Sequence, residues 1–199
     1  MSETVTSLQR LYSFILALAL TEALKEFSKP RDGSRSTEVG ARTSWWFDRG
    51  SIFALLTIVF LIVPFFHGMN LYLQATYAPK DGMSLSKGAL LLLDIFVFMI
   101  EAVFLFLLSR HLELREWRTF YGVVAVLLLI DSVWGFFVFR VHHATTLAWA
   151  VVNLATALIL FLPLCGLRNY QRTGAVICSV LMIVRTVADY CSSWNFYFG

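Results

Sequence analysis

Charged residues are scarce in this chain. Only 15% of its 199 residues are Asp, Glu, Lys or Arg, whereas a soluble globular domain averages about 25%. Hydrophobic residues make up 58% of the chain and aromatic residues 16%. This composition is typical of a polytopic membrane protein whose short loops leave no room for a folded domain outside the bilayer. The sequence therefore predicts one transmembrane domain over residues 1–199.

Cysteine is also rare, and motifs for catalysis or cofactor binding are missing. Cys165, Cys178 and Cys191 form no CxxC pair and fall in or beside apolar segments, so we expect buried thiols and no metal site. No basic run is interleaved with aromatic residues, which argues against a nucleic-acid partner. GxSxG, HExxH and Walker patterns do not occur. The sequence predicts neither an enzyme nor a cofactor.

Long apolar segments account for most of the chain. They predict spans at residues 8–27, 50–72, 88–109, 119–139, 147–164 and 174–194. The first has a short apolar core and ends in Glu22, Lys25 and Glu26, so it is either a short span, which we favour, or an interfacial helix. The predicted fold class is an all-α integral membrane bundle of about six transmembrane helices, or five plus an interfacial N-terminal helix.

Basic residues are distributed unevenly between the two sides of this predicted bundle. Eleven lie on the side of the loop 28–49 and four on the other, and Arg185 lies within a span. Because Lys and Arg are enriched in cytoplasmic loops, we expect loop 28–49 in the cytoplasm and the C-terminus outside, in a plasma (inner) membrane. The eleven are Lys25, Lys29, Arg31, Arg35, Arg42, Arg49, Arg110, Arg115, Arg118, Arg168 and Arg172; the four are Arg10, Lys80, Lys87 and Arg140.

Two acidic residues interrupt the third apolar segment. Asp94 and Glu101 are seven residues apart, so they project from nearly the same face of one helix. A carboxylate at that depth costs several kcal/mol unless it is paired, neutralised or facing water. We expect this face to point into the bundle.

Other spans carry polar residues at overlapping depths. These are Asp131, Asn153, Arg185 and Asp189, with His67 and Asn70 nearer the outer side. Such groups rarely face lipid, so we expect them to converge inside the bundle or at a subunit interface. Pro64 removes the hydrogen bond to the Phe60 carbonyl and predicts a kink beside His67 and Asn70.

The number of acids decides between two interpretations of this cluster. A structural network would have Arg185 neutralise Asp189 and knit the helices together. However, four carboxylates face one arginine and one titratable histidine, so at least two acids need protons, water or cations. We therefore favour an ion channel or transport path for a cation or proton, formed by a homo-oligomer, with Arg185 and Asp189 as gate or latch. Asp94→Asn or Glu101→Gln is expected to abolish flux.

Two other functions remain open from the sequence. The inner loops could make this a sensor or anchor subunit that docks a cytosolic protein partner through Arg31, Arg35, Arg42 and Arg115. His67 with His142 or His143 could ligate a haem, although no histidine spacing here is diagnostic.

Overall fold

The computed structural model describes residues 3–28, 49–77, 85–114, 116–142, 145–166 and 170–198, and within these ranges the chain is helical except at Glu116 and Ser193 and forms no strand. The six predicted apolar segments fall on six long helices, which a seventh, short helix follows. Their bounds are α1 Glu3–Ser28, α2 Arg49–Tyr77, α3 Leu85–Leu114, α4 Trp117–His142, α5 Thr145–Gly166, α6 Tyr170–Ser192 and α7 Trp194–Phe198.

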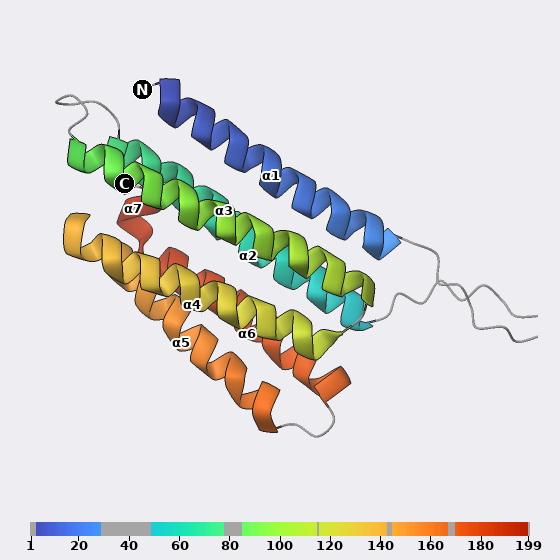
Figure 1. Ribbon diagram of the computed structural model, residues 1–199. Coiled ribbons are helices and arrows are strands. Elements are labelled where there is room, and N and C mark those ends of the chain that lie inside the picture. The colour runs from blue at the N-terminus through green and yellow to red at the C-terminus, as the bar shows by residue number, and fades with distance from the viewer. Residues whose placement is uncertain are drawn as a thin grey trace, which may run out of the picture.

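The six long helices run up and down beside one another (Figure 1). α1 packs on α2 and α3 at one edge, α5 packs on α4 and α6 at the other, and α2, α3, α4 and α6 lie between them. The start of α1 and the short α7 lie at the same end of the bundle, which we call the terminal end. Four helices, α2, α3, α4 and α6, therefore form the middle of the bundle.

Four of the described helices are long and apolar enough to cross a membrane. The stretches are Ser51–Tyr77, Gly88–Leu112, Trp117–Phe139 and Gly174–Ser192. α5 contains a shorter apolar stretch, Thr146–Leu162. Large apolar side chains such as Leu92, Phe96 and Leu162 are more than 60% exposed, which suits a surface that lipid chains cover. These properties fit an integral membrane protein.

The helices approach closely where small or hydroxyl side chains meet. A Cβ added at Gly135 of α4 would lie 3.0 Å from Cβ of Ala150 on α5, so glycine allows this close crossing. In the half away from the terminal end, the hydroxyls of Thr57, Tyr121 and Ser179 join α2, α4 and α6 at 2.8–3.3 Å. Hydroxyl groups thus hold three helices together without any charge.

The proline in α2 leaves a backbone group that another helix satisfies. α2 is helical on both sides of Pro64, which has no N–H to donate to the Phe60 carbonyl. Thr186 on α6 donates its hydroxyl to that carbonyl at 2.8 Å. The carbonyl that the sequence identified therefore contributes to helix packing.

This contact can be tested by removing one hydroxyl group. Thr186→Val keeps the side-chain shape and leaves the Phe60 carbonyl without its donor, so we expect a loss of about 1 kcal/mol in the free energy of unfolding. Thr186→Ser retains the hydroxyl and is the matched control. The measurement is a denaturant titration in detergent micelles followed by circular dichroism. A valine variant as stable as the serine variant would contradict this role.

Candidate functional site

The polar residues of the predicted spans are almost completely buried. Asp94, Asn153 and Asp189 are 0% exposed, Glu101 and Arg185 are 1% exposed, and Asp131 is 3% exposed. They come from α3, α4, α5 and α6. The interior of this bundle is therefore polar over part of its length, and each buried group must be satisfied there.

Asp94 lies in a cage of aromatic donors. Its Oδ2 accepts hydrogen bonds from the hydroxyls of Tyr72 at 3.0 Å and Tyr77 at 2.6 Å, and its Oδ1 accepts one from Nε1 of Trp134 at 3.0 Å. The three donors come from the end of α2 and from α4. Three donors on one carboxylate stabilise its charge, so this residue is held firmly in place.

Glu101 and Asp131 form a pair of adjacent carboxyl groups. Glu101 lies on α3 and Asp131 on α4, and the two side chains are close enough to share a hydrogen bond. Tyr12 of α1 donates its hydroxyl to Oε2 of Glu101 at 3.3 Å. No N–H or O–H group of the described residues donates to Oε1 of Glu101. Two neighbouring carboxyl groups in a low-dielectric interior cannot both stay ionised without a counter-charge.

Asn153 connects this carboxyl pair to Arg185. Its Nδ2 donates to Oδ2 of Asp131, and its Oδ1 accepts a hydrogen bond from Nε of Arg185 at 2.7 Å. The two neighbours fix the orientation of the amide, because one is an acceptor and the other a donor. One amide on α5 thus links α4 to α6.

Arg185 is buried, and no carboxylate among the described residues contacts it directly. Among the described residues its Nη1 and Nη2 have no hydrogen-bond partner, and it makes no ion pair. Its guanidinium carbon lies 5.6 Å from the ring centroid of Phe65, a cation–π contact. The positive charge still acts through space on Asp131 and Asp189. Arg185 and Asp189 are four residues apart on one helix but do not form the direct contact that neutralisation would favour.

Asp189 is tied instead to the short helix α7. The Tyr197 hydroxyl donates to Oδ2 of Asp189 at 3.2 Å, while Oδ1 has no partner among the described residues. Burial and the nearby Asp189 carboxylate raise the pKa of Tyr197 above its usual value, so the phenol keeps its proton. Helix α7 therefore closes the polar interior at the terminal end.

His67 lies beside this closure, and Asn70 does not join the polar network. Nδ1 of His67 is 3.2 Å from the Tyr190 hydroxyl, and its ring centroid is 4.8 Å from that of Tyr197. The Asn70 amide donates to the Phe66 carbonyl of its own helix at 2.8 Å. Of the two residues predicted near the outer side, only His67 borders the site.

Some predicted groups lie outside the described residues. This holds for the docking arginines Arg31, Arg35, Arg42 and Arg115, and for the side chains of His142 and His143. Within the described part of the chain, no group of three His, Cys, Asp or Glu side chains is arranged to hold a metal ion.

Phenol and indole groups are the site residues that the sequence reasoning missed. Tyr12, Tyr72, Tyr77, Trp134 and Tyr197 all donate to buried carboxyl groups. The sequence analysis assigns these five aromatic residues no role, and no spacing in the sequence marks them. The available signal was chemical: buried carboxylates require donors, and the spans contain few other donor side chains.

Comparison with known proteins adds no assignment to this geometry. No protein-family model, curated protein or solved structure matches this chain. The functional argument therefore rests on the buried network itself.

Proposed function

We propose that this protein is a six-span membrane protein that moves protons across the bilayer. In this proposal the carboxyl groups of Glu101 and Asp131 bind the proton on its way. The observation that carries the proposal is the burial of these two adjacent carboxyl groups, at 1% and 3% exposure. One shared proton lowers the repulsion between them. A pair that needs a proton, and can pass it on, suits a proton path better than a purely structural contact.

The surroundings of the pair favour a proton over a metal cation. Metal cations such as Ca²⁺ or Mg²⁺ require several oxygen lone pairs directed at one point. Here Tyr12 directs an O–H group at Glu101, and Asn153 directs an N–H group at Asp131. These donors occupy carboxylate oxygens that a metal would use, and they stabilise whichever carboxyl group has lost its proton.

Arg185 separates this pair from a third acid and supplies the gate. A fixed positive charge repels cations and protons that approach it. Asn153 holds Arg185 on the side of Asp131, and Asp189 lies one helical turn further toward the terminal end. The buried Nη1 and Nη2 of Arg185 and Oδ1 of Asp189 have no described partner, and ordered water would satisfy them. Protons would pass when ordered water connects Arg185 to Asp189.

At the terminal end the path would continue past Tyr197 to His67. Tyr197 donates to Asp189 and packs against the His67 ring. The two nitrogens of an imidazole ring can donate one hydrogen bond and accept another, which suits a residue at the mouth of such a path. On the predicted orientation this mouth faces the outside of a plasma membrane, with loop 28–49 in the cytoplasm, and copies of the chain associate as a homo-oligomer.

A liposome assay tests the proposal directly. Purified protein is reconstituted with a pH-sensitive dye inside, and a proton gradient is imposed with the membrane potential clamped. We expect wild-type protein to acidify the lumen and Glu101→Gln and Asp131→Asn to fall to the leak rate of protein-free liposomes, because an amide cannot carry the shared proton. A potassium-sensitive dye should report no flux.

The matched control is an acid outside the network. Glu22 is ion-paired with Lys25 on α1 at 3.2 Å, with 36% of its side chain exposed. Glu22→Gln should keep wild-type flux. Wild-type protein that transports no protons, or Glu101→Gln protein that transports them at the wild-type rate while folded, would refute the proposal.

A further inference from the structure

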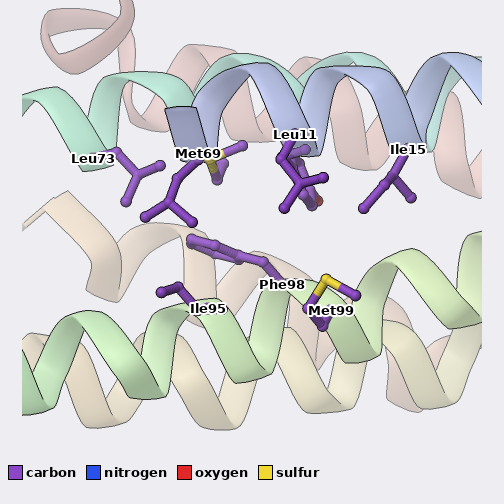
Figure 2. Close-up of a pocket in the computed structure, with 9 residues that line it drawn as sticks. Leu11, Ile15, Met69, Leu73, Ile95, Phe98 and Met99 are labelled. Atoms are coloured by element: carbon purple, nitrogen blue, oxygen red, sulfur yellow. The ribbon is translucent and has the colours of Figure 1, made fainter. Parts of the chain in front are cut away.

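A groove lies where α1, α2 and α3 meet. α1 contributes Leu11 and Ile15, α2 contributes Met69 and Leu73, and α3 contributes Ile95 and Met99, and these side chains face one another across the groove in Figure 2. Its enclosed space is small, about 20 Å³, and the rest of the groove is open to the surroundings. The groove shares one residue with the carboxyl network, because Tyr12 lines the groove and donates its hydroxyl to Glu101.

The walls of the groove present almost no polar groups to which water could hydrogen-bond. Its other lining side chains are hydrocarbon, aromatic or thioether groups, and the hydroxyl of Tyr12 is engaged with Glu101. A water molecule needs two to four polar partners to be held in a cavity, so hydrocarbon is the favoured content. Met69 and Met99 are unbranched and flexible, which lets the walls adapt to a chain of variable shape.

The mouth of the groove opens onto the apolar surface of the bundle. Leu11 is 49% exposed and Met99 is 44% exposed. Next to them, Phe14 on α1 and Phe96 on α3 are 61% and 62% exposed. The groove is thus continuous with the surface that lipid chains contact, in the half of α1, α2 and α3 nearest the terminal end.

We propose that this groove binds one acyl chain of a phospholipid from the leaflet at the terminal end. The chain would pack on Tyr12 and Phe98, whose ring centroids are 5.6 Å apart. Because Tyr12 donates to Glu101 from this wall, an occupied groove would also hold Tyr12 against the carboxyl group. The binding site itself does not depend on proton movement, so it can stand or fall separately from the proposed function.

Photocrosslinking with a modified phospholipid tests the site. The probe is a phosphatidylcholine with a diazirine in the middle of one acyl chain, incorporated into liposomes that contain the full-length protein. After irradiation, adducts are located by mass spectrometry. We expect severalfold more adducts on the α1 and α3 segments of the groove than on Leu158 and Leu162 of α5, although these two are 56% and 71% exposed.

A variant that fills the groove provides the control. Met99→Trp should lower adducts at Leu11 and Ile95 to the level found on α5, because the indole occupies the space of the acyl chain. Leu158→Trp on the far edge should leave them unchanged. If Met99→Trp fails to fold, Leu11→Phe at the same mouth takes its place. Equal labelling of groove and α5, or groove labelling that resists filling, would show ordinary annular lipid and overturn the proposal.

Discussion

Replacing Asp94 by leucine is expected to destabilise the protein by about 3 kcal/mol or more, enough to reduce the yield of folded protein sharply. Leucine fills the space of the carboxylate but leaves the donors of Tyr72, Tyr77 and Trp134 without an acceptor. Each buried donor without a partner costs about 1–3 kcal/mol. The measurement is the free energy of unfolding in detergent micelles.

A double-mutant cycle separates this effect from a general packing defect. Tyr77→Phe removes one of the donors, so its cost should be smaller in the Asp94→Leu protein than in the wild type. Asp94→Asn keeps one acceptor oxygen and should lie between the wild type and the leucine variant. If Asp94→Leu is as stable as the wild type, the aromatic cage makes no net contribution.

This prediction changes the role that the sequence suggested for Asp94. The spacing of Asp94 and Glu101 predicts that they share one helical face, and nothing in the sequence assigns them different roles in an ion path. Their surroundings differ: Asp94 receives three donors from side chains, while Glu101 receives one and adjoins a second carboxyl group. These contacts suit a structural role for Asp94, and the proposed proton path therefore rests on Glu101 and Asp131.

Composition and hydropathy were sufficient for the helical architecture, because a chain with so few charges can satisfy its backbone in lipid only through helices or a closed barrel. Proline chemistry also identified the Phe60 carbonyl. Its partner Thr186 lies 126 residues away, and nothing local connects the two. Which helix meets that carbonyl depends on how α2 and α6 pack, which no periodicity encodes.

The first helix shows a signal that hydropathy alone underrates. Its buried positions include Val5, Tyr12, Leu16, Ala19 and Ala23, which follow a spacing of seven, four, three and four residues. That pattern is a stripe on one helical face and predicts packing against other helices. α1 lies along α2 and α3, although it is not among the four stretches apolar enough to span by composition. This packing supports the proposal that α1 spans with its neighbours.

The numbers of acidic and basic side chains in the interior could be counted from the sequence. Which of these side chains contact one another could not be predicted from it. A spacing of four residues allows Arg185 and Asp189 to pair on the helix surface. In the bundle, Asn153 and Phe65 hold the guanidinium, and Tyr197 holds the carboxylate. Contacts with three other helices therefore decide a local pairing that the sequence left open.

Removing the charge of Arg185 is expected to cost about 3–5 kcal/mol, the usual effect of leaving a buried charge without its counter-charge. In Arg185→Leu, Asp131 and Asp189 lose the positive charge near them, and Oδ1 of Asn153 loses its donor. The measurement is again the free energy of unfolding in micelles. Arg10 lies exposed on α1, so Arg10→Leu should change that free energy by no more than about 0.5 kcal/mol.

A second substitution shows whether the loss is electrostatic. Asp189→Asn removes one negative charge and keeps an oxygen for the Tyr197 hydroxyl. In the Arg185→Leu background it should recover part of the lost stability, because one fewer buried carboxylate then lacks a counter-charge. If the losses in free energy of unfolding of the two single variants simply add in the double variant, Arg185 and Asp189 do not interact. Arg185 would then act through Asn153 alone, and the gate would need a different basis.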